Sequence, residues 1–162
     1  MAQTKFIVSD PEKCTGCGIC ELVCSAVKEG GFNPLLSRIR AIRIEPFMNM
    51  AIACRLCEDP KCVKSCPRKA LKKDESTGVI LVDAQRCDGC RWCLEACEFG
   101  ANFIHPNKKI AVTCDLCQLE PKCVTHCPKE ALQLMTGVEL GQKIRKRALI
   151  KLIAENLEFI QR

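Results

Sequence analysis

Apolar residues in this chain gather in short segments, and those that alternate or run continuously over a few positions predict strands. Three such segments are Lys5–Val8, Ile39–Phe47 and Val79–Val82. A turn-rich loop at Gly30-Gly31-Phe32-Asn33-Pro34 precedes the second segment, and Thr77-Gly78 forms a turn before the third. The pattern predicts small strands, turns and short helical pieces, which need another source of stability besides a large apolar core.

The C-terminal segment, residues 138–162, has a different, helical pattern. Aliphatic residues recur every four positions, at Leu140, Ile144, Ala148 and Leu152. This amphipathic period predicts a helix from about Glu139 to Ile160. Three positions remain open for it: folded back on its own domain, docked on a partner subunit or a second copy, or lying on a membrane surface. We expect docking on a neighbouring subunit, because an aliphatic stripe left in water is an exposed apolar patch.

Sixteen of the 162 residues are cysteine. This density is common in disulfide-rich secreted proteins. However, residues 1–10 contain neither the apolar core of a signal peptide nor a twin-arginine pair, and no apolar run approaches the roughly 18 residues of a transmembrane helix. We therefore expect a reduced cytoplasmic protein whose thiols bind metal, without a membrane partner.

The cysteines form four groups: Cys14, Cys17, Cys20 and Cys24; Cys54, Cys57, Cys62 and Cys66; Cys87, Cys90, Cys93 and Cys97; and Cys114, Cys117, Cys123 and Cys127.

The sequences that flank these groups repeat. An aspartate stands four residues before the first cysteine of groups one and three, at Asp10 and Asp83. The motif Cys-Pro-x-x-Ala-Leu occurs twice, at residues 66–71 and 127–132. Groups two and three thus make one compact unit, and groups one and four hold the complementary halves of another. If Gln133–Met135 pairs with Lys5–Val8, the two ends of the chain rebuild a second unit around the first, which is an interleaved duplication.

The spacing Cys-x2-Cys-x2-Cys in groups one and three places three thiolates within a very short loop. Such a loop can wrap one corner of an iron–sulfur cubane, while the fourth cysteine starts a helix and suits a second cluster. Gly16, Gly18 and Gly89 allow backbone N–H groups to approach the sulfides. Structural zinc usually takes two separated cysteine pairs around one ion, which this spacing fits poorly. The pattern therefore predicts that iron, in four [4Fe–4S] clusters, occupies the sixteen cysteines.

The formal net charge of +6 counts every cysteine as neutral. An oxidised [4Fe–4S] core with four thiolates carries about −2, so four of them bring the holoprotein to about −2. Many lysines and arginines are then counter-charges for clusters. With six Phe, one Trp and no Tyr, the chain has no aromatic-interleaved basic patch, and no nucleic-acid partner is expected. The single tryptophan, Trp92, stands beside Cys93 in group three and is expected to pack over the cluster there and exclude water.

Four motifs carry a family resemblance: Cys14-Thr15-Gly16-Cys17, Cys54-Arg55-Leu56-Cys57-Glu58-Asp59-Pro60, Cys87-Asp88-Gly89-Cys90-Arg91-Trp92-Cys93 and Cys114-Asp115-Leu116-Cys117. On these residues the chain resembles the four-cluster, ferredoxin-like electron-transfer subunits of the dimethyl-sulfoxide-reductase iron–sulfur family. The resemblance covers about Lys5 to Leu134. It is greatest to the short subunits that serve tungsten aldehyde oxidoreductases, carbon monoxide dehydrogenases and hydrogenases. One departure is Cys97-Glu98-Phe99-Gly100, where many relatives have Cys-Pro-Tyr-Gly.

This resemblance implies an α+β, ferredoxin-like fold of the bacterial 2[4Fe-4S] type, duplicated and interleaved. A four-cluster domain would cover residues 1–137, with an inner unit at 48–100 and an outer unit at 1–30 plus 108–137, before the C-terminal amphipathic helix at 138–162. It also implies that paired groups exchange their fourth ligands. The clusters would then be A (Cys14, Cys17, Cys20, Cys127), B (Cys114, Cys117, Cys123, Cys24), C (Cys54, Cys57, Cys62, Cys97) and D (Cys87, Cys90, Cys93, Cys66).

The function implied by the resemblance is a relay of single electrons between a catalytic subunit and a second redox partner. No Ser–His–Asp set, P-loop or dinucleotide fingerprint is present, so the chain is expected to be a non-catalytic subunit. A tungsten- or molybdenum-dependent aldehyde oxidoreductase is the favoured catalytic partner, and a carbon monoxide dehydrogenase or hydrogenase is the alternative. Further copies of the chain, or a flavin or ferredoxin protein, are other possible partners. A zinc-binding scaffold without redox function is the alternative from another class.

Overall fold

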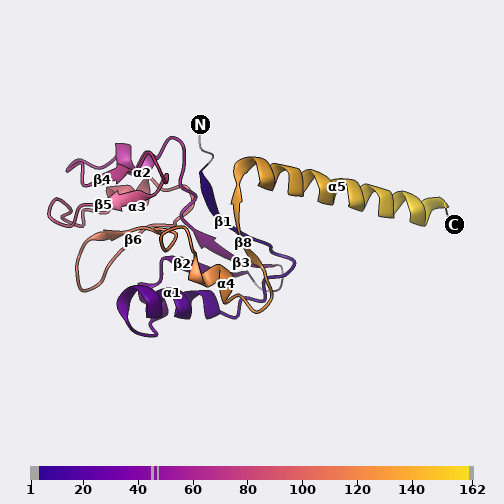
Figure 1. Ribbon diagram of the computed structural model, residues 1–162, viewed down its shortest axis with the longest axis horizontal. Coiled ribbons are helices and arrows are strands. Elements are labelled where there is room, and N and C mark those ends of the chain that lie inside the picture. The colour runs from indigo at the N-terminus through magenta and orange to yellow at the C-terminus, as the bar shows by residue number, and fades with distance from the viewer. Residues whose placement is uncertain (1–3, 45, 47, 161–162) are drawn as a thin grey trace.

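The structure, a computed structural model, describes residues 4–44, 46 and 48–160. Figure 1 shows the strands and shorter helices gathered in one body, from which the last helix projects. In chain order, the elements are β1 (Lys5–Ser9), α1 (Ile19–Glu29), a 3-10 helix η1 (Pro34–Leu36), β2 (Ile39–Ile44), β3 (Met48–Ala53), α2 (Lys61–Lys64), β4 (Leu71–Lys73), β5 (Ile80–Val82), α3 (Trp92–Glu95), β6 (Phe103–Ile104), β7 (Ala111–Val112), α4 (Lys122–Thr125), β8 (Leu132–Thr136) and α5 (Gly137–Ile160). The protein is therefore a mixed α and β structure, as expected.

The two ends of the ligand-bearing region meet in an antiparallel pair, β1 with β8. Ile7 lies opposite Leu134, and Ser9 lies opposite Leu132. This confirms the predicted pairing of Lys5–Val8 with Gln133–Met135. The pairing brings group one, which follows β1, next to group four, which precedes β8.

Two further antiparallel pairs, β4 with β5 and β6 with β7, connect the later cysteine groups. Leu71 lies opposite Val82 in the first pair, so the predicted strand at Val79–Val82 is present as β5 from Ile80 onward. The Thr77-Gly78 turn connects β4 to β5, and Gly78 has a φ of +75°, a conformation that glycine adopts without strain.

The segment Ile39–Phe47, predicted as one strand, is instead the first half of a hairpin. β2 ends at Ile44 and β3 runs from Met48 to Ala53, with Ala41 opposite Ala51. Phe47, the last residue of the predicted strand, lies outside the described residues. The second strand was missed because the connection contains no Asn-Gly or Gly-rich turn signal.

Each strand pair connects the fourth cysteine of one group to the first cysteine of the next. β2–β3 lies between groups one and two, β4–β5 between groups two and three, and β6–β7 between groups three and four. β8 follows group four and pairs with β1, which precedes group one. The four groups and the four strand pairs therefore alternate in a closed ring, which is completed by the two ends of the ligand-bearing region.

The buried apolar residues lie among the cysteines. Leu56 and Leu116, each placed two residues after the first cysteine of its group, are 2% and 0% exposed. Several cysteines belong to the same cluster of buried residues. The core and the ligand sites are thus one region, so burial and metal binding are coupled in this fold.

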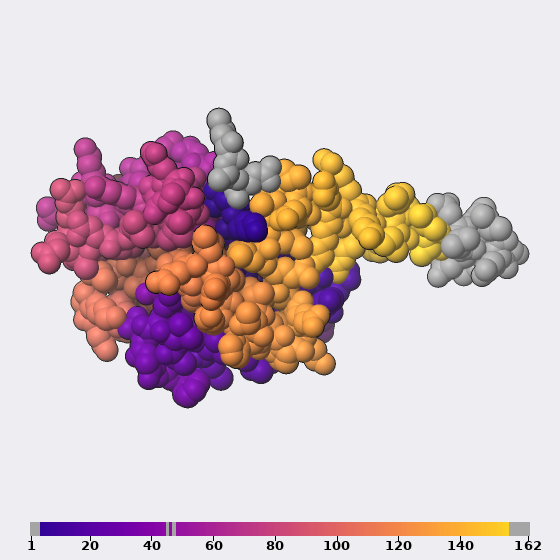
Figure 2. All heavy atoms as spheres, in the orientation of Figure 1, coloured from indigo at the N-terminus to yellow at the C-terminus, as the bar shows by residue number. Residues whose placement is uncertain are grey.

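Helix α5 begins directly after β8 and extends away from the body (Figures 1 and 2). Lys143 and Arg147, in its first turns, form ion pairs with Asp10 at 3.3 and 2.9 Å, and Arg147 also pairs with Glu12. Aliphatic residues of the same helix are more than half exposed, among them Ile144, Leu149, Ile150 and Ile153. The helix therefore contacts its own domain through basic side chains, and the body does not cover these four aliphatic residues. No helix of the described residues has the length and apolar composition required to cross a membrane.

Candidate iron–sulfur cluster sites

All sixteen cysteines are free thiols, and they gather in sets that combine distant parts of the chain. One hollow is lined by Cys14, Cys17, Cys20 and Cys127. A second hollow is lined by Cys24, Cys114, Cys117 and Cys123. In each hollow, three cysteines of one group meet the fourth cysteine of its partner group.

Among the remaining eight cysteines, thiols of groups two and three also lie near one another. Burial raises the pKa of the Cys54 thiol to about 11, and negative charge on its neighbours adds to this effect; these neighbours are Cys62, Cys57 and Cys97. Burial also raises the pKa of the Cys93 thiol to about 11, with further contributions from Cys87, Cys62 and Cys66. Cys97 therefore lies near thiols of group two, and both Cys62 and Cys66 of group two lie near Cys93 of group three.

Thiols of different sets also approach one another. Burial raises the pKa of Cys114 to about 12, and the nearby thiols of Cys24 and Cys54 raise it further. Burial likewise raises the pKa of Cys123, and Cys20 is among the thiols that contribute. Thiols that line the second hollow are thus near both Cys20, which lines the first hollow, and Cys54 of group two.

Backbone N–H groups donate to the sulfur of the fourth cysteine in every group. In three groups the donor follows the cysteine by four residues: Ala70 to Cys66 at 3.3 Å, Ala101 to Cys97 at 3.5 Å, and Ala131 to Cys127 at 3.3 Å. Cys24 accepts instead from the N–H of Arg38 at 3.3 Å. Helix α1 continues beyond Cys24, so the chain returns to this sulfur only at Arg38. Such N–H donors stabilise negative charge on sulfur.

A left-handed residue aims three of these N–H groups at sulfur. It stands three residues after the fourth cysteine, at Lys69 (φ +50°), Gly100 (φ +58°) and Glu130 (φ +49°). Group three therefore keeps the geometry of groups two and four although Glu98 replaces their proline. Glycine adopts this conformation freely, whereas Lys69 and Glu130 adopt it at a cost of about 1 kcal/mol each.

Glycines in the ligand loops allow a close approach that no other residue permits. A Cβ at Gly89 would lie 2.3 Å from the carbonyl oxygen of Lys109, and one at Gly16 would lie 2.8 Å from Oδ1 of Asn49. Both glycines also have a positive φ, of +71° and +68°. The loop of group one is therefore packed against β2–β3, and the loop of group three against the β6–β7 turn.

The sets fit an iron–sulfur cluster better than a compact ion site. Four thiols line each hollow, and backbone N–H groups donate to sulfur. Apolar residues such as Ala41 and Ala51 line part of the first hollow, whereas Lys28 and Asp115 line part of the second. No three His, Cys, Asp or Glu side chains of the described residues converge on one point as ligands of a single ion. When bound, a [4Fe–4S] cluster supplies one-electron oxidation and reduction. The role of the protein is to hold the thiolates, donate N–H groups to them and keep water away.

Exposure differs sharply among the ligands. Cys17 and Cys90 are exposed, whereas the other fourteen cysteines are buried or half-buried. Each exposed cysteine is the second of its group, one in group one and one in group three.

Trp92 is 63% exposed, so the expectation that it packs over a cluster and excludes water is wrong.

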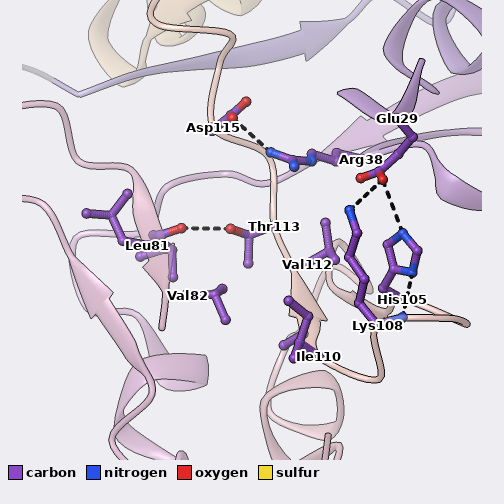
Figure 3. A pocket seen from close by; sticks show the side chains of 12 residues that line it. Glu29, Arg38, Leu81, Val82, His105, Lys108, Ile110, Val112, Thr113 and Asp115 are labelled. Atoms are coloured by element: carbon purple, nitrogen blue, oxygen red, sulfur yellow. Dashed lines mark hydrogen bonds and ion pairs between the residues drawn. The ribbon is translucent and has the colours of Figure 1, made fainter. Parts of the chain in front are cut away.

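A polar hollow ties α1 to the β6–β7 turn (Figure 3). The Nδ1 atom of His105 accepts backbone N–H groups from Asn107 and Lys108 at 3.2 and 3.1 Å, so the ring proton is on Nε2, which donates to Glu29 at 3.3 Å. Lys108 donates to the same carboxylate at 2.6 Å and lowers the pKa of Glu29. Both ring nitrogens of His105 therefore take part in hydrogen bonds that hold this turn against α1.

The second half of the hollow ties α1 and β2 to group four. Asp115, which follows the first cysteine of that group, accepts from Lys28 and from Arg38, each at 2.8 Å (Figure 3 shows the Arg38 contact). Burial would raise the pKa of Asp115, but the hydrogen bond from Lys28 and the charge of Arg38 lower it. Sequence reasoning missed these cross-links, because the partners are more than 70 residues apart in sequence.

The fold and its cysteine sets define an iron–sulfur electron-transfer protein of the ferredoxin type. Comparison with known families agrees with this class. The 4Fe-4S dicluster domain family matches residues 47–137, and a 4Fe-4S binding domain matches residues 6–28. The chain belongs to the 4Fe-4S dicluster domain family.

Similar proteins include the polyferredoxin-like subunit of an aliphatic sulfonate oxidoreductase from Pyrococcus furiosus. It is 40% identical over 82% of this chain and 78% of the relative. The electron transfer subunit PhsB of a thiosulfate reductase from Salmonella typhi is 31% identical over 78% of this chain and 73% of the relative. Among solved structures, a chain of the active site complex BamBC of benzoyl coenzyme A reductase, in complex with zinc, superimposes with a TM-score of 0.50 at 24% identity. That alignment covers 98% of this chain and 99% of the other, and it concerns the fold alone.

Proposed function

We propose that the sixteen cysteines hold four [4Fe–4S] clusters with exchanged fourth ligands. The two hollows support clusters A and B, and the neighbours of Cys54 and Cys93 support clusters C and D. The ligand sets are A (Cys14, Cys17, Cys20, Cys127), B (Cys114, Cys117, Cys123, Cys24), C (Cys54, Cys57, Cys62, Cys97) and D (Cys87, Cys90, Cys93, Cys66).

The fold follows from an interleaved duplication, in which an inner unit at 48–100 is repeated by an outer unit at 1–30 plus 108–137. The backbone N–H of Asp10 donates to the carbonyl of Ala131 at 2.7 Å, and that of Asp83 donates to Ala70 at 2.8 Å. Ala131 and Ala70 in turn donate to Cys127 and Cys66. The same chain of contacts therefore recurs in both units. Strand β2 lies in the connection after the first part of the outer unit, and its partner β3 begins the inner unit at residue 48.

The clusters form a linear path in the order A, B, C, D. Cys123 and Cys20 bring B next to A, Cys114 and Cys54 bring B next to C, and Cys93 and Cys62 bring D next to C; this order uses the thiol neighbours described above. The two exposed cysteines belong to A and D, which are the ends of this path. Electrons therefore enter and leave at the ends, and the interior clusters B and C are shielded from solvent.

The chain acts as an electron-transfer subunit between a catalytic oxidoreductase subunit and a second redox protein carrying a flavin or an iron–sulfur cluster. The relative from Pyrococcus furiosus supports this role, because it is named as a polyferredoxin-like subunit of an oxidoreductase. A tungsten- or molybdenum-dependent, aldehyde-oxidising catalytic subunit is favoured, and the complex is cytoplasmic. A carbon monoxide dehydrogenase or hydrogenase is the second candidate for the catalytic partner.

The observation that carries this proposal is the meeting of three cysteines of one group with the fourth cysteine of another. Protein purified without oxygen should be brown and contain roughly sixteen irons. Cys97→Ala should abolish the EPR signals of cluster C, and the matched Cys66→Ala should abolish those of cluster D. If Cys97→Ala removes only cluster D, the ligand exchange is wrong. A colourless protein that contains zinc would make the chain a structural scaffold and end the electron-transfer role.

A further inference from the structure

Asn102 is a polar residue at a position where two other cysteine groups are followed by leucine. It stands five residues after Cys97, the fourth cysteine of group three. The equivalent residues after the fourth cysteines of groups two and four are Leu71 and Leu132, which are 2% and 4% exposed. Asn102 is buried as well, at 8% exposure. Group three therefore buries a side-chain amide in a place that groups two and four fill with an aliphatic side chain.

The protein satisfies this amide only in part. The Nδ2 atom of Asn102 donates to the backbone carbonyl of Cys93 at 3.3 Å. Its Oδ1 atom is buried and has no hydrogen-bond partner within the part of the chain that the structure describes. A buried acceptor without a partner destabilises a folded protein, and a leucine of nearly the same shape would avoid that cost. Stability alone therefore does not explain the asparagine.

The same side chain also reaches a sulfur atom of group two. Burial is the largest influence on Cys62 and raises the pKa of its thiol, whereas a hydrogen bond from the side chain of Asn102 lowers it. The amide nitrogen carries two N–H donors, so it can serve the carbonyl of Cys93 and the sulfur of Cys62 together. Because both partners are acceptors, the amide must turn its nitrogen toward them, and Oδ1 is left facing away.

The residue before Asn102 donates to the same proposed cluster. The backbone N–H of Ala101 donates to Cys97 at 3.5 Å. Cys97 and Cys62 are both ligands of cluster C in the proposed scheme, and Cys93 is a ligand of cluster D. A donated N–H stabilises negative charge on sulfur, and a reduced cluster carries more negative charge than an oxidised one. The bond from Asn102 to Cys62 therefore favours the reduced state of cluster C.

We infer that Asn102 sets the potential of cluster C relative to cluster D by donating its side-chain N–H to the sulfur of Cys62. This inference rests on the proposed function. It gives C a higher potential than leucine at this position would, and so favours the passage of an electron from D to C. Since C and D are neighbours in the proposed path, residue 102 acts on one particular step of the relay.

The test is a redox titration of the full-length holoprotein, followed by EPR, with the signals of C and D assigned through the Cys97→Ala and Cys66→Ala proteins. Asn102→Leu keeps the shape of the side chain and introduces the residue that follows groups two and four. It should lower the equilibrium constant for electron transfer from D to C about tenfold, which is about 59 mV for a one-electron step. The iron content should stay the same.

The control variant is Ser65→Ala. The hydroxyl of Ser65 donates to the carbonyl oxygens of Cys62 and Trp92 at 3.2 and 3.3 Å, so it connects the same two groups through backbone acceptors. Ser65→Ala should leave the midpoints of both clusters in place. A shift of C as large as that in Asn102→Leu would show that any lost contact between the two groups has this effect, and it would overturn the inference.

A second measurement does not require Asn102→Leu to fold. The protein is prepared with nitrogen-15 in the side-chain amides of asparagine and with Asn49→Asp, because Asn49 lies against the group-one loop and would add its own coupling. Pulsed EPR of reduced cluster C should then show a hyperfine coupling to nitrogen-15. Absence of this coupling, or an unchanged equilibrium constant in Asn102→Leu, would overturn the inference. If the clusters form and titrate but residue 102 has no effect, the proposed function stands, whereas a chain without iron would refute both.

Discussion

A comparison of two glycine substitutions tests how the group-three loop is built. Gly89 and Gly100 both have a positive φ, of +71° and +58°. The space around them differs, because a Cβ at Gly89 would meet the carbonyl oxygen of Lys109 at 2.3 Å, and a Cβ at Gly100 would meet nothing within 4 Å. Gly100→Ala therefore costs only the left-handed backbone, about 1 kcal/mol. Gly89→Ala adds an overlap of about 1 Å with a backbone atom, which raises the cost to roughly 3 kcal/mol or more.

The assay is anaerobic reconstitution of both variants, followed by iron analysis, EPR and the thermal loss of visible absorbance. Gly100→Ala should bind the full iron content and lose its colour at a slightly lower temperature than the unsubstituted protein. Gly89→Ala should lose about one quarter of the iron, because the loop between Cys87 and Cys90 no longer closes on site D. Equal behaviour of the two variants would refute the argument from close approach.

Three further predictions concern local strain, the anchor of α5 and charge near site C. Lys69→Gly should raise stability by up to about 1 kcal/mol in chemical denaturation of the holoprotein, because it relieves a left-handed lysine; a loss of stability would show that the lysine side chain matters more than its backbone. Asp10→Asn should increase proteolysis of α5 at neutral pH. Burial, the largest single influence, raises the pKa of Asp10, but the hydrogen bonds from Arg147, the backbone N–H of Glu12 and Lys143 together outweigh it and keep this pKa below the usual value. This anchor is therefore present above that usual value and is lost as the pH falls through the lowered pKa; equal proteolysis at pH 7 in both proteins would contradict it. Reversal of Lys61 and Lys64 to Glu should lower the midpoint potential of cluster C by roughly 20–40 mV in low salt, from screened Coulomb interactions over about 10 Å; redox titration followed by EPR measures this, and unchanged midpoints would refute the electrostatic account.

The cysteine spacing and the repeated flanks predict the parts of the fold that are built from local pattern. The pairing of β1 with β8 could be foreseen because residues 66–71 and 127–132 share a motif, and the strand after each has an obvious partner. Hairpin β2–β3 could not be foreseen, since its connection has no recognisable turn sequence. Its inner face is specified by contacts with the group-one loop, which lies more than 20 residues earlier.

The charged residues that surround each cysteine group were also harder to predict from the sequence than the cysteine ligands themselves. Counting residues along the sequence assigns Arg68 to the surroundings of group two. In the structure its Nε lies 3.0 Å from Asp88, in the ligand loop of group three. The ion pair between Lys61 and Glu98 likewise connects group two to group three. Ion pairs that connect separate groups are long-range contacts, and no window of sequence contains both partners.

The closed ring of strand pairs has a consequence for biosynthesis. In the proposed ligand scheme, site D is complete when Cys93 has been synthesised, and site C when Cys97 has. Site A, which uses the first three cysteines of the chain, waits for Cys127, roughly 110 residues after Cys14. At about 5–20 residues per second, these thiols remain without their fourth partner for roughly 6–22 s on the ribosome. The earliest cysteines to emerge are thus the last to be protected, and they are the ones most in need of an environment free of oxidants during translation.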